Sequence, residues 1–174
     1  EEIIPIGECK EDGNIRPNST QEKLDQLKLA FDTKGTVTAA TSSPLTDGAA
    51  ATIICEENYA KENNLNILGR IVSTAVEGCD PDYMGLGPIG ASKKALMRAD
   101  LSIDKIDIFE LNEAFASQSL ACIKDLGIDQ KKVNIDGGAL ALGHPLGATG
   151  ARITGKAADL LRRENKKYAL STQC

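Results

Sequence analysis

The sequence contains no tryptophan, a single histidine and no apolar run long enough to cross a membrane. Its five cysteines include no CxxC pair, which argues against a zinc site or a disulfide framework and favours reduced thiols. With 20 basic against 25 acidic residues, the net charge of -5 provides no broad basic surface for a nucleic acid. No secretion signal, internal repeat or low-complexity tract is recognised either. We therefore expect a globular, cytoplasmic protein that binds neither a membrane nor a nucleic acid.

The 174 residues divide into two parts with different patterns. Residues 1–46 contain polar turns and one short amphipathic helix before Gly35, with capping-box spacing between Ser19 and Glu22. We expect this part to be the end of an insertion or lobe. From residue 47 onward, strands and helices alternate, which predicts a layered α/β domain over residues 47–174.

The expected elements of this domain follow from its apolar patterns. Residues 49–55 are apolar and lead into a helix that ends near Asn64. Strands are predicted over 67–77, 106–110 and 168–172, and helices over 87–98, 114–126 and about 147–163. Gly127 ends the second of these helices. We expect that helix to be deeply buried through its apolar residues Leu120, Ile123 and Leu126.

The single histidine, His144, lies in a run of small residues that extends from Gly137 to Arg152. It stands between Gly143 and Pro145, which places it on a turn, and it precedes a helix that begins with residues of little bulk. The unpaired N–H groups of a helix start would allow a ligand to approach. The glycines could equally serve tight helix–strand packing, and their spacing fits neither the dinucleotide nor the P-loop fingerprint.

Three further polar residues stand at the ends of predicted elements. Asn112 follows a strand, where open α/β sheets place their ligands, although asparagine is also a good helix cap. Glu113 is either a general base or a first-turn acid that stabilises the helix dipole. Cys174 follows the last strand, where a cysteine is usually a small buried hydrophobe. None of the three indicates a reaction by itself.

Taken together, these segments resemble the thiolases, the CoA-dependent enzymes that make or cleave 3-ketoacyl-CoA. The resemblance is carried by Asn-Glu-Ala-Phe-Ala at 112–116, by the glycine-rich run 137–152 and by a strand that ends in Cys174. It extends over the whole chain and includes residues 35–39 and 47–51. Ketoacyl synthases and sterol-carrier thiolases share the fold but differ at the Asn-Glu-Ala-Phe position.

The resemblance implies a layered α/β fold and a domain division. Residues 47–174 correspond to the thiolase C-terminal domain, a mixed five-stranded sheet flanked by helices that is cut before its last strand. Residues 1–46 correspond to the end of the loop lobe that lies across this domain.

The resemblance also implies roles for three site residues. The histidine that corresponds to His144 activates the nucleophilic cysteine that carries the acyl group, and it helps to bind the thioester oxygen. Asn112 corresponds to the residue that holds a water, and this water forms an oxyanion hole with His144. Cys174 corresponds to the acid/base cysteine, which removes the α-proton of acetyl-CoA in synthesis and protonates the same carbon in cleavage. That role requires a thiolate and therefore a lowered pKa.

Other residues correspond to ligand contacts of the family. Arg16 matches an arginine beside the adenine of CoA, Ser43 a serine near the pantetheine, and Met84 a methionine of the acyl pocket. The residues that match the lining of the same tunnel are Ala39, Ala114 and Phe115. Packing is an equal alternative for Ser43 and Met84. No metal and no permanently bound cofactor are implied, since CoA and acyl-CoA are substrates.

Two features of the family pattern are missing. None of the five cysteines stands in the Cys-small-Ser-Gly motif of the nucleophile, and the chain stops at Cys174, before the glycine-rich turn of a second oxyanion hole. We therefore expect the C-terminal half of a thiolase of fatty acid metabolism, with the acetyl-CoA acetyltransferase type favoured. The complete enzyme is expected to be a homodimer or tetramer in the cytoplasm, or in an organelle matrix of a eukaryote. The alternatives are a non-catalytic fragment that binds CoA or a thiolase subunit, and one half of a split enzyme.

Overall fold

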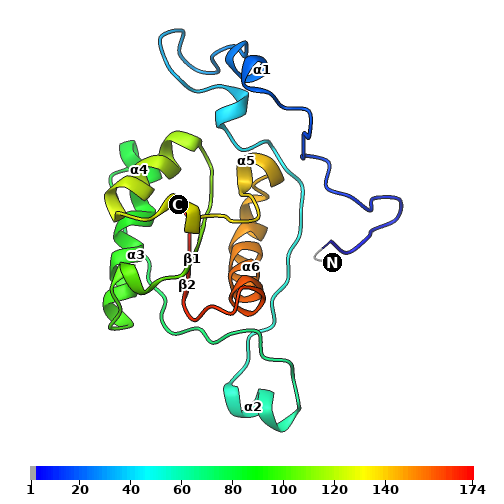
Figure 1. The fold of residues 1–174 in the computed structure, drawn as a ribbon, viewed down its shortest axis with the longest axis vertical. Helices are drawn as coiled ribbons and strands as arrows, with labels where there is room; N and C mark the ends of the chain where they lie inside the picture. Colours follow the sequence, from blue (N-terminus) through cyan, green and yellow to red (C-terminus); the bar gives the residue numbers. More distant parts are fainter. Residues whose placement is uncertain (1–2) are drawn as a thin grey trace.

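A parallel pair of strands forms the centre of the molecule in the computed structural model, which describes residues 3–174 (Figure 1). Strand β1 (Ile108–Leu111) pairs with β2 (Ala169–Thr172), in a register that runs from Ile108 opposite Ala169 to Leu111 opposite Thr172. Figure 1 shows the pair between helix α6 (Thr149–Arg163) on one side and α3 (Gly87–Arg98) with α4 (Ala116–Leu126) on the other. This arrangement confirms the layered α/β fold.

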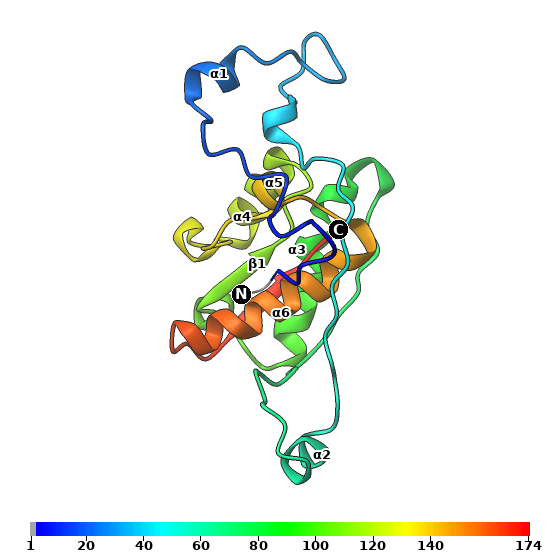
Figure 2. The same cartoon turned by 90° about the vertical axis from the view of Figure 1, so that its right-hand side faces the viewer.

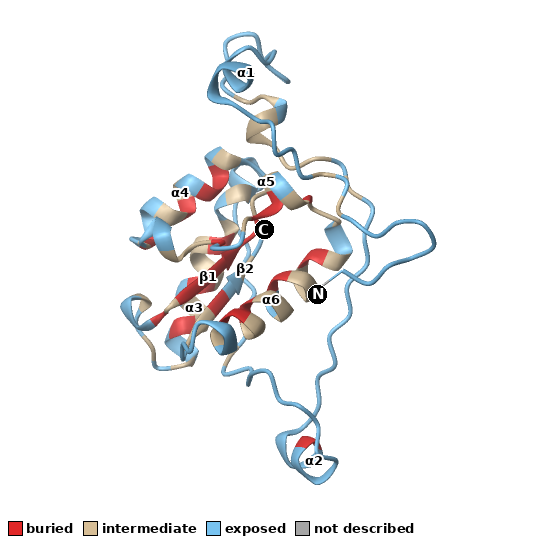
Figure 3. Cartoon of the chain, turned by 45° about the vertical axis from the view of Figure 1, so that its right-hand side comes forward, coloured by how far each residue is buried: buried red, intermediate tan, exposed pale blue. Residues whose placement is uncertain are grey.

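The apolar core fills the space between the strands and the helices on both faces. Towards α3, the buried side chains of Leu96, Ile106, Phe109 and Leu170 form one cluster. Towards the other face, α6 buries a stripe at helical spacing that consists of Thr149, Ile153, Ala157 and Leu160. Every residue of β1 is buried, so the sheet is covered on both sides at this point (Figure 3).

The expected five-stranded sheet is not formed, since the sheet within residues 3–174 has two strands. The predicted strand 67–77 runs beside α3 and is held by side chains: Ser73 Oγ donates to Ala95 O at 2.8 Å, and Lys94 Nζ donates to Glu77 Oε2 at 2.7 Å. The apolar stretch 49–55 is likewise extended and exposed. Extended backbone becomes a strand only when it pairs with a neighbour, and within residues 3–174 neither stretch pairs with β1 or β2.

Helix α4 is less buried than predicted. Its buried residues are Gln118, Ser119, Cys122 and Leu126, whereas Leu120 is 53% exposed. The helix starts at Ala116 and ends at Gly127, which has the left-handed conformation that such an end requires. The prediction is confirmed for Leu126, which is 7% exposed, and it is wrong for Leu120, because the face of α4 that meets the domain also carries Gln118, Ser119 and Cys122.

Residues 3–46 form an extended arm that carries α1 (Gln21–Asp25), while residues 1–2 of the predicted lobe lie outside the described residues. The helix cap is Thr20 rather than Ser19, and the helix ends at Asp25, well before Gly35. In Figures 1 and 2, α1 and α2 (Glu57–Glu62) project from opposite ends of the layered body. The remaining short elements are α5 (Ala139–Leu142) and the 3₁₀ turns Ala39–Thr41, Pro81–Leu86, Ile103–Lys105, Gln130–Lys132 and Leu146–Ala148.

The helices of the described residues are all too short or too polar to cross a membrane.

Candidate active site at the carboxyl ends of the strands

The parallel register brings two predicted site residues to one edge of the sheet. Asn112 directly follows β1, and its N–H donates to Thr172 O, the last residue of β2, at 3.0 Å. Cys174 follows two residues later. Asn112 is 1% exposed, and it is not a helix cap, because α4 begins four residues later behind Phe115. Its side chain is therefore available for another contact.

That contact is His144. Asn112 Nδ2 lies 3.5 Å from His144 Nε2, and His144 Nδ1 lies 2.8 Å from Thr149 Oγ1. With the amide donating to Nε2, the proton of a neutral imidazole is on Nδ1 and is donated to Thr149. Burial lowers the pKa of His144, and the charge of Arg152 lowers it further, so the neutral form is favoured at pH 7. The Nε2 lone pair then faces the end of β1, where it can accept a proton.

The turn that carries His144 is fixed by the N-terminal arm. Gly143 has φ +100°, and an added β-carbon would overlap the side chains of Thr46 and Asn14. The His144 N–H donates to Thr46 Oγ1 at 3.2 Å, and Asn14 Nδ2 donates to Leu142 O at 3.1 Å. This glycine therefore allows a close approach of backbone and arm, which is the packing interpretation of the glycine-rich run at this position.

Glu113 is not a first-turn acid in this structure, and its carboxylate is held by two hydrogen bonds. Its Oε1 accepts from Asn134 Nδ2 at 2.9 Å, and its Oε2 accepts from the Leu140 N–H at 3.1 Å. Both oxygens are thus bonded within the protein, and the helix that follows starts only at Ala116. The residue links two segments of the site.

Cys174 lies beside the turn that leads into α3. A β-carbon on Gly87 would lie 3.5 Å from Cys79 Sγ and 3.9 Å from Cys174 Cβ. Although Cys174 as a whole is exposed, the surrounding chain partly removes its thiol from water, which raises its pKa, and the neighbouring Cys79 raises this pKa further. The direction is opposite to the lowered pKa that the family role requires. Among residues 3–174, no hydrogen bond joins its side chain to Asn112 or His144, so the convergence of the three side chains remains a prediction.

The predicted ligand-contact residues fall into two groups. Ser43, Ala114 and Phe115 lie together: the Ser43 N–H donates to Ala114 O at 3.0 Å, and Ser42 pairs with Phe115. Ala39 opens the 3₁₀ turn just before them. Arg16, on the arm, and Met84, in the 3₁₀ turn before α3, are exposed, and none of the contacts just described includes them. Met84 is 64% exposed, so packing does not account for it here.

Glu110 is a polar residue of the site region that the sequence interpretation missed. It lies in β1 and is 1% exposed, and its Oε1 has no hydrogen-bond partner among residues 3–174. Burial raises its pKa to about 7, although the charges of Arg152 and Lys156 on α6 act against this shift. An acid within the apolar stretch 106–111 was the signal that could have identified it.

We expect Glu110→Gln to remove a pH dependence of stability. The pKa of Glu110 is raised from 4.5 to about 7, so its contribution is complete below pH 4.5 and is lost as the pH rises through 7. The loss should be on the order of 1–3 kcal/mol. Urea midpoints from pH 5 to 8 check this: the wild type should lose stability relative to the variant.

The difference in urea midpoint between wild type and Glu110→Gln reports on Glu110 alone, because all other titrating groups are present in both proteins. His144, with its lowered pKa, has the opposite slope below pH 6.5, but it is common to both proteins. Glu62→Gln, at an exposed position of α2, is the matched control and should follow the wild type. A constant difference between wild type and Glu110→Gln across the range would contradict the expectation.

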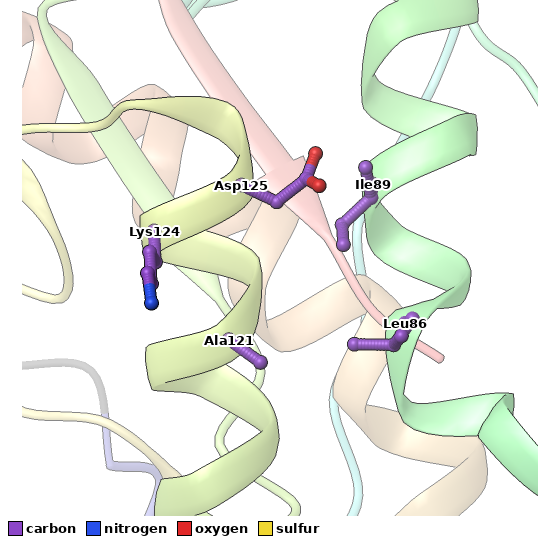
Figure 4. Close-up of a pocket in the computed structure, with 5 residues that line it drawn as sticks. All are labelled: Leu86, Ile89, Ala121, Lys124 and Asp125. Carbon is purple, nitrogen blue, oxygen red and sulfur yellow. The ribbon is translucent and has the colours of Figure 1, made fainter.

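A surface pocket of the described residues lies away from this site. It lies between α3 and α4 and is lined by Leu86, Ile89, Ala121, Lys124 and Asp125 (Figure 4). None of the predicted site residues lines it. Nor do the described residues contain a group of three or more His, Cys, Asp or Glu side chains that could hold a metal ion.

Comparison with known proteins assigns the family. Residues 65–174 match the family model of the thiolase C-terminal domain, and residues 1–58 match that of the thiolase N-terminal domain. The 3-ketoacyl-CoA thiolase of Salmonella typhimurium is 50% identical over 186 residues, which cover 99% of this chain and 48% of the relative. That of Vibrio vulnificus is 53% identical over 164 residues, which cover 92% and 42%. The chain thus spans about half the length of the curated relatives it matches.

Solved structures agree with this assignment. The acetyl-CoA acetyltransferase of Bacillus anthracis superposes with a TM-score of 0.91 at 44% identity, and the human mitochondrial 3-ketoacyl-CoA thiolase in complex with CoA with a TM-score of 0.87 at 46% identity. Each alignment covers 94% of this chain and 41% of the other. Residues 1–174, with their layered α/β fold, belong to the thiolase family.

Proposed function

We propose that these residues are part of an enzyme that transfers acyl groups to or from CoA. The reaction is the Claisen condensation of acyl-CoA or the thiolytic cleavage of 3-ketoacyl-CoA, with the acetyl-CoA acetyltransferase type favoured. The observation that carries the proposal is the contact of Asn112 with a neutral His144 at the carboxyl end of β1. The relatives named 3-ketoacyl-CoA thiolase and acetyl-CoA acetyltransferase support the same reaction class.

In this proposal, His144 and Asn112 act together on the thioester. The His144 Nε2 lone pair accepts the proton of a nucleophilic cysteine supplied from outside residues 1–174, because none of the five cysteines has the required motif. Protonated Nε2 then donates to the developing oxyanion. Asn112 Oδ1, which is buried without a partner among residues 3–174, is suited to hold the water that completes the oxyanion hole.

Cys174 is proposed as the acid/base of the carbon–carbon bond step. Its thiolate removes the α-proton of acetyl-CoA, the carbanion attacks the enzyme thioester, and the nucleophilic cysteine leaves as a thiolate, which regains the proton that Cys174 has taken up; cleavage is the reverse. Because the pKa of Cys174 is raised by its surroundings here, the lowering needed for this role must come from groups of the full-length protein.

The substrate and the assembly are also part of the proposal. CoA is expected along the segment of Ala39, Ser43, Ala114 and Phe115, with Arg16 beside its adenine, while Met84 belongs to the acyl pocket. A homologous thiolase has been solved in complex with CoA. We further propose the division into a lobe over residues 1–46 and a C-terminal domain over residues 47–174. The full-length protein is expected to be a homodimer or tetramer of the cytoplasm or an organelle matrix that functions in fatty acid metabolism.

A non-catalytic role in binding CoA or a thiolase subunit, or a role as one half of a split enzyme, is the second candidate. It is favoured by one observation, the absence of a Cys-small-Ser-Gly motif from residues 1–174. The candidates differ in the source of the nucleophilic cysteine. A longer chain supplies it in the first, a second polypeptide supplies it in a split enzyme, and a non-catalytic fragment has none.

The purified 174-residue chain is expected to cleave acetoacetyl-CoA no faster than its Cys174→Ala variant, because no residue in it can hold the acyl group. The assay measures loss of acetoacetyl-CoA in the presence of CoA. A full-length thiolase that carries residues 1–174 should be active in the same assay, and an inactive one would refute the proposed function. Turnover by the isolated chain that depends on Cys174 would mean that one of the other four cysteines is the nucleophile.

A further inference from the structure

Asn134 forms hydrogen bonds to the edge of β1 with both its backbone and its side chain. Its backbone N–H donates to Phe109 O at 2.8 Å, beside the parallel bridge between Phe109 and Val133. Its side-chain Oδ1 accepts from the Leu111 N–H at 2.9 Å, and its Nδ2 donates to Leu111 O at 2.8 Å. A φ of +47° turns the chain away at this point, which asparagine tolerates. The last residue of β1 is therefore held by an amide in place of a third strand.

The backbone fixes which way this amide points. Oδ1 faces a donor and Nδ2 faces an acceptor, so the orientation of the Asn134 side chain is determined. The second hydrogen of Nδ2 is donated to Glu113 Oε1, and the other Glu113 oxygen accepts from the Leu140 N–H. Each oxygen of the Glu113 side chain therefore faces an N–H donor. An ionised carboxylate has only acceptor atoms, so it satisfies both donors.

The carboxylate links the two segments that carry the site. Glu113 directly follows Asn112, and Leu140 lies in α5, four residues before His144. The approach is so close that a β-carbon on Gly138 would overlap the Glu113 carboxylate and the Asn134 amide. A side chain at position 138 would push α5 away from the end of β1.

We propose that Glu113 and Asn134 are positioning residues, which hold Asn112 and His144 at the spacing that their chemistry needs. The inference rests on the thiolase function proposed above, because that function gives Asn112 and His144 the chemistry for which they must be positioned. Glu113 and Asn134 act through the backbone of the two segments, and neither side chain is free to act as a base.

The test is NMR of the 174-residue chain with labelled histidine, in which His144 gives the only imidazole signals. Ring ¹⁵N shifts identify the tautomer, and a pH titration gives the pKa. In Glu113→Gln, the NH₂ group of the new amide faces another donor, either Asn134 Nδ2 or the Leu140 N–H, so one of the two hydrogen bonds is lost. We expect the Nδ1–H tautomer to become a mixture and the pKa of His144 to move up toward the ordinary value of histidine as the ring is hydrated.

Two further variants separate positioning from general stability. Glu62→Gln should leave the tautomer and the pKa of His144 unchanged. If Glu113→Gln lowers the urea midpoint but leaves both His144 properties at their wild-type values, Glu113 is merely structural and the proposal is overturned. Should Glu113→Gln fail to fold, Glu113→Asp decides, because it keeps the charge but is one methylene too short to reach both donors; wild-type His144 signals in it would likewise overturn the proposal.

A reciprocal exchange tests the pairing itself. Asn134→Asp places a carboxylate against both the Glu113 carboxylate and Leu111 O. Adding Glu113→Gln repairs the first of these two contacts, because the new amide donates to the carboxylate at position 134 while its oxygen still accepts from the Leu140 N–H. The double variant should therefore bring His144 closer to wild type than Asn134→Asp alone does. A double variant that is as perturbed as the sum of the single variants would refute the link.

A measurement of thiolase activity separates the positioning role of Glu113 and Asn134 from the proposed thiolase function. In a full-length thiolase that carries residues 1–174, Glu113→Gln should lower kcat by about 10–10²-fold with little change in KM, as expected for misplaced catalytic groups. An unmutated full-length protein without thiolase activity would refute the proposed function, while the His144 signals would still decide whether Glu113 and Asn134 position the pair.

Discussion

His144→Ala in a full-length thiolase that carries residues 1–174 should lower acylation of the nucleophile and carbon–carbon bond formation together. The loss should be at least about 10²–10³-fold, the cost of one oxyanion donor, because in the proposed mechanism the imidazole also takes the proton of the nucleophilic thiol. Its lowered pKa and its bond to Thr149 prepare Nε2 for both tasks. The measurement pairs thioester labelling from radioactive acetyl-CoA with the rate of condensation.

The control for this prediction lies on the same turn. Leu146 is 75% exposed and two residues from His144, so Leu146→Ala alters the turn surface without removing the imidazole. It should label and condense at close to wild-type rates. Normal labelling by His144→Ala would show that the histidine does not activate the thiol.

Cys174→Ser should separate the two halves of the reaction. Labelling of the nucleophile should remain close to wild type, whereas condensation should fall by about 10²–10⁴-fold, the range of a lost acid/base group. A serine hydroxyl is too weak an acid to supply a base at neutral pH, while a thiol with a reference pKa of about 8.5 needs only a modest shift. The same two assays measure the outcome.

Cys79→Ser is the matched control, because this second exposed thiol lies beside Cys174 and has no assigned role in the reaction. It should keep both activities. If Cys174→Ser cannot be labelled, Cys174 contributes to acylation and the division of roles is wrong.

Local signals allowed the best sequence predictions. Helix α3 has the predicted bounds, with Gly87 and Pro88 at its start, and Gly127 ends α4 in the left-handed conformation. Both strands lie within a few residues of their predicted positions. Glycine and proline act through the backbone of their own residues, so their effects are readable without knowledge of the fold.

Non-local features were predicted less well. A strand needs a partner, and the apolar residues 67–77 pair with no strand among residues 3–174. The buried face of α4 depends on what surrounds it, so Leu120 could not be assigned from periodicity alone. For the site, the sequence indicated His144 and Asn112, but the bonds of Glu113 with Asn134 join residues 21 positions apart, and no local pattern reveals such a contact.

The pairing of β1 with β2 also determines when the site can be assembled. Ile108 and its partner Ala169 are separated by 61 positions, and within the described part of the chain the only other pairing of these strands is the bridge between Phe109 and Val133. The entropy cost of closing so long a loop must be met before the hydrogen bonds between β1 and β2 can stabilise the chain. Strand β2 should therefore join late in folding. During translation, β1 leaves the ribosome well before β2 and has an open, apolar edge in the meantime, which can pair with another chain. A destabilising change in β2 should therefore lower the yield of soluble protein before it alters the finished site.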